Sequence, residues 1–453
     1  MHHERLLAAV RTAVRRPLAT AVLGAALLAG CSDATPSSQN LTCTGGPDGS
    51  PPNPLYVSLM QDQLTNADYW EAEPRILAAG LGFTDIIGVP GLDSSDLDTQ
   101  KSSTLAAGGA WNVVVTTLTT IAQRAYTSAI GPNGVTTGYG WPVQYCDGLP
   151  IEFSWPVLPT TVQGSDFVVH LNDGSSTQPR VASIQPNFEY NERSTVVVFG
   201  EFGNRLPPDQ PGALYPVRFE IVDDGTPLTL AGPGGRTVSA VGFTYGTGDD
   251  PYTGYNPGRG PTLCAAKLSR MSTAGEGGPP AFNGQMPNDG VALYGDAAQY
   301  RLRVLTTGGF SPDGVTSVFP TEYERFFRVQ AIDAAGREHW LERTGVPYEI
   351  DGGTVTVVGL ADLGVAQSSY DDGYVEDHDN QIDIVLSGDE SAVRAIRMVE
   401  IPASGRYSPF YNPGGPGNDP DPETIYSQPG PLTQQAVTIA LDDPMTVTYP
   451  PAD

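Results

Sequence analysis

The chain has 453 residues, with 24 Lys and Arg against 51 Asp and Glu, and its formal net charge is -27. Hydrophobic residues make up 39% of it, including 20 Tyr, 14 Phe and 5 Trp, which is typical of a folded protein rather than a disordered one. The acidic excess argues against nucleic acid or an anionic membrane surface as a direct partner, because a phosphate-binding face needs clustered Lys and Arg.

The first 31 residues are predicted to be a targeting segment rather than part of the fold. A basic stretch contains Arg5, Arg11, Arg15 and Arg16. A largely apolar run of 13 residues from Leu18 to Gly30 follows it, shorter than the roughly 20 residues that a membrane-spanning helix needs. The segment ends in Leu27-Leu28-Ala29-Gly30-Cys31, which resembles the lipobox of bacterial lipoprotein signal peptides.

The lipobox resemblance implies cleavage after residue 30 and attachment of lipid to Cys31. Since Ser32 rather than Asp follows this cysteine, the resemblance implies the outer membrane in a cell with two membranes. The alternative is an ordinary secretory signal with a chance cysteine. Either signal predicts export, and the lipobox predicts a location at the cell envelope with contact to the membrane only through the lipid anchor.

Export places the remaining cysteines, Cys43, Cys146 and Cys264, in an oxidising compartment. One disulfide and one thiol are the simplest expectation, with three possible pairings. We expect the pair Cys146 and Cys264, because Cys43 lies in a segment predicted to be a tether.

Composition divides the mature chain into four parts, because it is longer than one hydrophobic core usually serves. Residues 31–54 are rich in Ser, Thr, Gly, Pro and Asn and are predicted to be a flexible tether. Residues 55–147 are predicted to be a helix-containing N-terminal region. The predicted helices are one from Ser102 or Ser103 to Ala125, with apolar residues every three or four positions, and a shorter one from Tyr69 to Leu81.

From residue 148 onward, short alternating apolar stretches predict antiparallel β-sandwiches, one over 148–290 and a second β-rich domain over 291–453. In Tyr215–Val222 and Gln299–Leu305, apolar residues fall on one face and charged residues on the other, which predicts half-buried strands. The fold class expected is therefore mainly β. Asp-Gly pairs between strands, such as those at 147, 173, 224 and 351, predict tight turns.

The residues from Pro150 to Val157, Leu158 to Val162 and Ser165 to Val169 carry a family-level resemblance. Their order of an apolar strand, a Pro-containing edge, a Thr-Val turn and a second strand is similar to the opening of bacterial Ig-like domains. The resemblance covers about 100 residues if it extends to Tyr245. It implies tandem Ig-like sandwiches and carries over no catalytic residue, because such domains serve in display, spacing or adhesion.

An acidic run near the C-terminus predicts a Ca²⁺ site, since Ca²⁺ prefers six to eight oxygen ligands. Its candidate ligands are Asp371, Asp372, Glu376, Asp377, Asp379 and Asp383. The spacing departs from the EF-hand loop, because Gly388 stands where the bidentate Glu should be. The alternative is a solvated loop leading into the strand Ile382–Leu386.

Motifs of catalysis are sparse in this sequence. The loop Asn412–Gly417 resembles the oxyanion loop of tripeptidyl-aminopeptidase type α/β hydrolases, but the chain has no G-x-S-x-G elbow and no His after the loop. His170, His339 and His378 show no metal-ligand spacing. The sequence therefore favours a non-catalytic lipoprotein that binds an envelope protein or polysaccharide, spaces or displays. The alternative is an anchored hydrolase or lyase that uses two carboxylates on a polymer, with Trp70, Trp141 and Trp340 lining a sugar groove.

Overall fold

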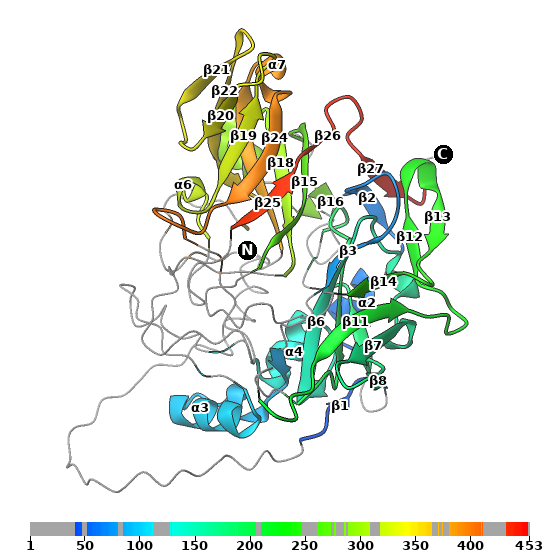
Figure 1. Ribbon diagram of the computed structural model, residues 1–453. Helices are drawn as coiled ribbons and strands as arrows, with labels where there is room; N and C mark the ends of the chain where they lie inside the picture. Colours follow the sequence, from blue (N-terminus) through cyan, green and yellow to red (C-terminus); the bar gives the residue numbers. More distant parts are fainter. Residues whose placement is uncertain are drawn as a thin grey trace, which may run out of the picture.

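A computed structural model describes residues 41–47, 52–79, 85–109, 111, 127, 129–185, 187, 189–204, 210–246, 261–272, 276–277, 285–286, 289–308, 318–364, 370, 374, 380–408, 410 and 432–451. The fold is mainly β, and nearly all strand pairs that it describes are antiparallel, the exception being β15 with β26. Two groups of sheets form two units, the first lower and the second upper in Figure 1.

The first unit contains two main sheets that share one hydrophobic core. One has the order β3-β6-β10-β9, with β4 also paired to β6, and the other has the order β14-β11-β7-β8. The strands of the first sheet are β3 Ile76–Ala79, β4 Asp85–Ile87, β6 Cys146–Phe153, β9 Val181–Ser183 and β10 Thr195–Gly200. The strands of the second are β7 Phe167–Leu171, β8 Ser176–Thr177, β11 Pro216–Ile221 and β14 Thr244–Gly246. Apolar side chains of both sheets, including Ile151, Phe167 and Phe219, meet in this core.

The second unit packs a six-stranded sheet, β21-β22-β23-β18-β15-β26, against a four-stranded sheet, β20-β19-β24-β25. The six strands are β15 Leu263–Arg270, β18 Tyr300–Thr306, β21 Pro347–Ile350, β22 Gly353–Ala361, β23 Gln381–Gly388 and β26 Thr438–Ile439. The four strands are β19 Arg328–Ile332, β20 Glu338–Leu341, β24 Ile396–Ile401 and β25 Thr433–Ala436. Alternate residues such as Leu302, Val329 and Ile384 fill the core between the two sheets.

Short pairs and helices complete the described fold. The pairs are β1 Thr44–Gly45 with β5 Val143–Gln144, β2 Leu64–Asp68 with β27 Thr446–Tyr449, β12 Thr229–Ala231 with β13 Thr237–Ser239, and β16 Glu276–Gly277 with β17 Gln285–Met286. The helices are α2 Pro54–Leu59, α3 Leu97–Ala106, α4 Pro132–Gly138, α5 Asp289–Tyr294, α6 Tyr323–Phe326 and α7 Glu390–Val393. Within the described ranges, none of these helices is long and apolar enough to cross a bilayer.

Several predicted strands and one predicted tight turn are confirmed. The strand predicted at Phe167–Leu171 is β7, and the strands predicted near residues 195, 300 and 382 are β10, β18 and β23. Asp351 and Gly352 both have positive φ, 52° and 78°, between β21 and β22. This is the conformation that a two-residue hairpin turn requires, and Asp-Gly adopts it readily.

The N-terminal helices were predicted less well. The helix expected over Tyr69–Leu81 is wrong: its second half is β3, which pairs with β6 through Ile76 and Phe153. A short apolar run is compatible with either a buried strand or a helix. Here the segment is a strand because it pairs with the long strand β6. Helix α3 begins earlier than expected, because the Asp96 carboxylate accepts a hydrogen bond from the Thr99 N–H at 2.9 Å. Residues 110 and 112–125 of the predicted helix lie outside the described residues.

Strand pairing joins segments on both sides of the predicted boundary between residues 290 and 291. Strand β15 precedes it by twenty residues or more, yet β15 pairs with β18 over its whole length and belongs to the second unit. In the same way, β3 and β4 from the predicted helical region complete a sheet of the first unit. Strand pairing between distant segments sets these boundaries, and composition does not report it.

Candidate functional site

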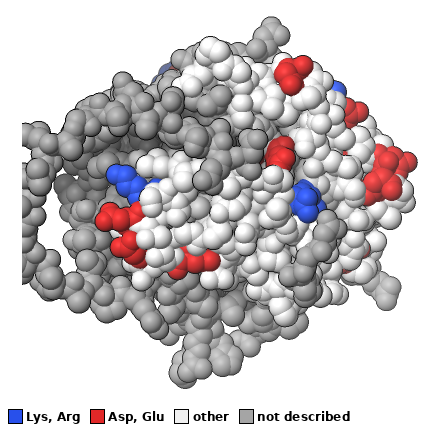
Figure 2. Space-filling model, turned by 90° about the horizontal axis from the view of Figure 1, so that it is seen from below, with Lys and Arg blue, Asp and Glu red and all other residues white. Residues whose placement is uncertain are grey.

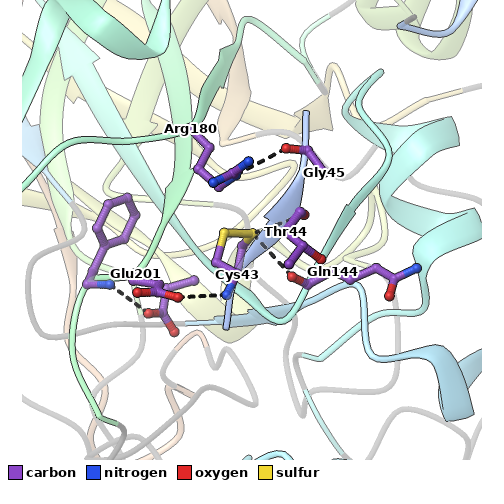
Figure 3. The surroundings of a disulfide bond; sticks show 9 residues. Cys43, Thr44, Gly45, Gln144, Arg180 and Glu201 are labelled. Atoms are coloured by element: carbon purple, nitrogen blue, oxygen red, sulfur yellow. Dashed lines mark hydrogen bonds between the residues drawn. A yellow bond between two sulfur atoms is a disulfide. The ribbon is translucent and has the colours of Figure 1, made fainter. Parts of the chain in front are cut away.

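The disulfide links Cys43 to Cys146, with a Cα–Cα distance of 4.5 Å (Figure 3). Pairing of β1 with β5 brings the two cysteines together, since each cysteine adjoins one of these strands. The Cys43 N–H donates to Glu201 Oε1 at 2.8 Å, and Arg180 Nε donates to the Gly45 carbonyl at 3.1 Å. The N-terminal segment is therefore fixed to the first unit from Cys43 onward.

The expected pair of Cys146 with Cys264 was wrong. Cys264 is the free cysteine of the described chain, and its thiol donates to the Leu305 carbonyl at 3.4 Å across β15 and β18. Burial raises the pKa of this thiol well above its usual value, so it stays protonated at neutral pH. The error came from assigning Cys43 to the tether, because the tether-like composition concealed a buried cysteine followed by a two-residue strand.

Most of the other predicted site residues lie outside the part of the chain that the structure describes. Cys31 and five of the six candidate Ca²⁺ ligands, Asp371, Asp372, Glu376, Asp377 and Asp379, lie outside the described residues, as do His378 and the loop 412–417. The sixth candidate, Asp383, is buried in β23 and accepts a hydrogen bond from Arg303 Nε at 2.7 Å.

The three tryptophans considered for a sugar groove lie in different parts of the molecule. Trp70 is buried, and its indole N–H donates to Ser194 Oγ at 3.3 Å. Trp141 packs edge to face against Tyr56 in the first unit. Trp340 lies half-exposed on β20, with the Arg328 guanidinium 3.9 Å from its ring centre. They do not line one groove.

The largest constellation of ionisable groups lies between the two units. We call it the charged seam, and its members are Asp68, Glu192, Lys267, Arg301, Arg303, Asp362 and Asp383. Each has a side chain less than a tenth exposed. Asp68 and Glu192 come from segments packed with the first unit, and the other five from β15, β18, β22 and β23 or the residue that follows.

Arg303 is the centre of the charged seam. Its Nε and Nη2 donate to the two oxygens of Asp383 at 2.7 and 3.1 Å, while its Nη1 donates to Glu192 at 2.8 Å. It also contacts Asp68 at 3.2 Å and donates to Asp362. A guanidinium has five N–H donors in a planar fork, so one Arg can hold several carboxylates in this way.

Asp68 joins the remaining cations. Arg301 donates to both of its oxygens at 3.0 and 3.1 Å, and Lys267 Nζ donates to Oδ1 and to the Met445 carbonyl. Burial alone would raise the pKa of Asp68, but Arg301, Lys267 and Arg303 outweigh it and hold that pKa well below its usual range. Burial lowers the pKa of Lys267 to about 8 against the opposing pull of Asp68.

The charged seam was missed because the alternation in β18 predicted that Arg301 and Arg303 face water. Instead all seven residues of β18 are buried, with the apolar face in the core of the second unit and the arginines against the first unit. The second face of the sheet is covered by another part of the same chain. A signal was present in the sequence: Lys267 is one of only two lysines, and it also falls within an apolar stretch.

A second buried polar cluster, the Glu152 pocket, adjoins the charged seam. It comprises Glu152 on β6, Thr195 on β10, and Asn187 and Asn380 in the segments before β10 and β23. Thr195 Oγ1 lies 2.5 Å from Glu152 Oε2 and 3.3 Å from Asn380 Oδ1. Burial raises the pKa of Glu152 to about 8, although hydrogen bonds from Thr195 and Asn380 oppose this.

Two buried polar atoms of this pocket have no hydrogen-bond partner within the described part of the chain. They are Glu152 Oε1 and Asn187 Oδ1. An unsatisfied buried polar group costs about 1–3 kcal/mol, which is large against a total stability of about 5–15 kcal/mol. Polar groups left this way usually have ordered water or an ion as partner.

These observations limit what the described residues can do chemically. The charged seam is buried, and each of its three cations and four carboxylates has at least one ion-pair partner within it. No group of three His, Cys, Asp or Glu residues suited to a metal occurs among residues that the structure describes. On the face seen in Figure 2, the described acidic side chains are scattered and only a few basic ones lie among them. The seam can therefore hold the two units together, and the Glu152 pocket has two buried oxygens without a hydrogen-bond partner.

Comparison with known proteins found no matching family model, no similar curated protein and no similar solved structure.

Proposed function

We propose that this protein is an exported, lipid-anchored lipoprotein with a non-catalytic role in binding, spacing or display at the cell envelope. The observation that carries the proposal is the charged seam. Its ionisable groups are buried and paired with one another, so they join the two β units into one body rather than meeting a substrate. A rigid body of two units is what a spacer or a display module needs.

The disulfide supports export and shortens the tether. Disulfides persist in oxidising compartments such as the periplasm or the cell surface. The disulfide fixes the chain at Cys43, so only the 11 residues between Cys31 and Cys43 separate this point from the proposed anchor. At about 3.3–3.6 Å per residue, this stretch spans at most roughly 40 Å. The protein would therefore stand close to the membrane, with the β1–β5 side of the first unit nearest to it.

We interpret each of the two units as an Ig-like sandwich. The two opening strands of the Ig-like resemblance correspond to β6 and β7, with turns between them. Two antiparallel sheets around one core agree with a sandwich in both units. The partner proposed is an envelope protein or a polysaccharide, and the location is the outer membrane in a cell with two membranes.

Membrane anchoring can be tested by labelling cells with a radioactive or clickable fatty acid and separating their membranes. Wild type should carry label and sediment with the membranes, whereas Cys31→Ala should carry none and appear in the soluble fraction. Cys264→Ala is the matched control, since it removes another cysteine and should leave labelling unchanged. Cleaved Cys31→Ala protein that remains fully membrane-bound would contradict the proposal.

A further inference from the structure

Oxygen atoms from three separate elements converge in the Glu152 pocket. Glu152 and Thr195 stand directly opposite each other on β6 and β10 of the first unit. Asn380 reaches them from the second unit, where its Nδ2 donates to the Thr306 carbonyl at 3.0 Å. This bond fixes the amide so that Oδ1 faces Thr195, at 3.3 Å. The pocket thus presents oxygen from both units.

Two buried oxygens of the Glu152 pocket receive no hydrogen bond within the described structure. The Thr195 hydroxyl has one hydrogen, which it shares between Glu152 Oε2 and Asn380 Oδ1. The Asn187 amide lies 3.5 Å from Asn380 Oδ1, the outer limit for a hydrogen bond. Glu152 Oε1 and Asn187 Oδ1 have no partner in the described structure, although both residues are at most 1% exposed.

We propose that the Glu152 pocket binds a hard divalent cation, Ca²⁺, through oxygens of Glu152, Thr195, Asn187 and Asn380. Ca²⁺ takes carboxylate, amide and hydroxyl oxygens at about 2.3–2.6 Å, so neighbouring ligand oxygens stand roughly 3.3–3.7 Å apart. The distance from Asn380 Oδ1 to Thr195 Oγ1, 3.3 Å, already has this spacing. The cation would supply a partner for both unpaired oxygens.

This site is distinct from the calcium loop that the sequence predicts, although Asn380 follows Asp379 directly in the chain. Its ligands join β6 and β10 to the residue before β23, so the cation would link the two units beside the charged seam. It is also independent of the lipid anchor. Failure of one proposal therefore leaves the other standing.

The test uses the full mature chain in detergent, stripped with chelator and titrated with Ca²⁺ or Mg²⁺. Ca²⁺ should raise the melting temperature of wild type, and metal analysis after desalting should find one more bound Ca²⁺ in wild type than in Glu152→Gln. Asp166→Asn is the matched control, because it removes another buried carboxylate and should bind as wild type does. Equal Ca²⁺ content and equal melting shifts in wild type and Glu152→Gln would overturn the proposal.

Two further variants keep the result decisive. If Glu152→Gln does not fold, Thr195→Val, which keeps the shape and removes the hydroxyl, should weaken Ca²⁺ binding on the order of tenfold. Unchanged affinity in Thr195→Val would then refute the site. Asp377→Ala combined with Asp379→Ala should retain the Ca²⁺ bound at Glu152. Loss of all bound Ca²⁺ in that double variant would instead assign it to the acidic run.

Discussion

Strands β11 and β18 have the same alternation of apolar and charged residues but opposite surroundings. In β11, Phe219 and Ile221 face the core of the first unit, while Arg218 and Glu220 lie partly exposed on the outer face. In β18 the alternate residues Arg301 and Arg303 are buried in the charged seam. The alternation shows that a strand has two different faces, and it does not show whether the charged face meets water or another part of the chain.

The largest effect is expected from removing the centre of the charged seam. Arg303→Leu leaves Asp68, Glu192, Asp362 and Asp383 close together without their shared cation. Breaking a buried ion pair on one side typically costs about 3–5 kcal/mol, because the partner charges stay buried and unpaired. Urea unfolding should show a loss of this size in the free energy of unfolding.

The matched control for that variant is Arg218→Leu on β11, whose side chain is 43% exposed. Its loss should be far smaller. If both substitutions destabilise the protein equally, the charged seam does not carry the energy assigned to it.

A smaller loss is expected from removing the disulfide with Cys43→Ser and Cys146→Ser together. The bond spans 103 residues, and disulfides typically contribute about 2–4 kcal/mol by restricting the unfolded chain. Only the first unit contains it, so calorimetry of the variant also tests coupling across the charged seam. One transition at a lower temperature is expected, whereas two separated transitions would show that the units unfold independently.

Much of the fold was predictable from the sequence because strand patterns and turns are local. Strand β7 and the Asp351-Gly352 turn follow from neighbouring residues alone. The charged seam and the pairing of Cys43 depend on which distant segments meet, and alternation or composition holds no information on that. The Glu152 pocket shows the same limit, since its oxygens come from residues 152, 187, 195 and 380. A site assembled from two units has no characteristic residue spacing by which the sequence could reveal it.

A pH effect is expected from Asp166, which lies outside the charged seam. Burial raises the pKa of this carboxyl to about 7, opposed by the hydrogen bond from the Gln163 N–H and reinforced by the charge of Asp224. Between about pH 4 and pH 7 the unfolded chain ionises this group while the folded protein keeps it protonated. The folded state binds more protons there, so the stability present below pH 4 is lost as the pH rises to 7.

Substitution isolates that contribution. Asp166→Asn cannot ionise, so its free energy of unfolding should fall less between pH 4 and pH 7 than that of wild type. Urea unfolding at closely spaced pH values measures the difference. Parallel pH curves for the two proteins would show that Asp166 titrates normally in the folded state.

The smallest effect is expected on the outer face of β11 and β7. Glu220 Oε2 lies 2.9 Å from His170 Nε2 and 3.1 Å from Arg218 Nη2, and all three side chains are between a quarter and a half exposed. Exposed ion pairs contribute about 1 kcal/mol or less and are screened by salt, with a Debye length of about 3 Å at 1 M. Arg218→Gln should therefore lower the free energy of unfolding by less than about 1 kcal/mol in dilute buffer, and this loss should vanish in 1 M NaCl.

Arg303→Leu should keep most of its loss of stability in the same salt, because a buried ion pair is screened much less. Salt that rescues both variants alike would mean that water reaches the charged seam, and the contrast between β11 and β18 would then fail.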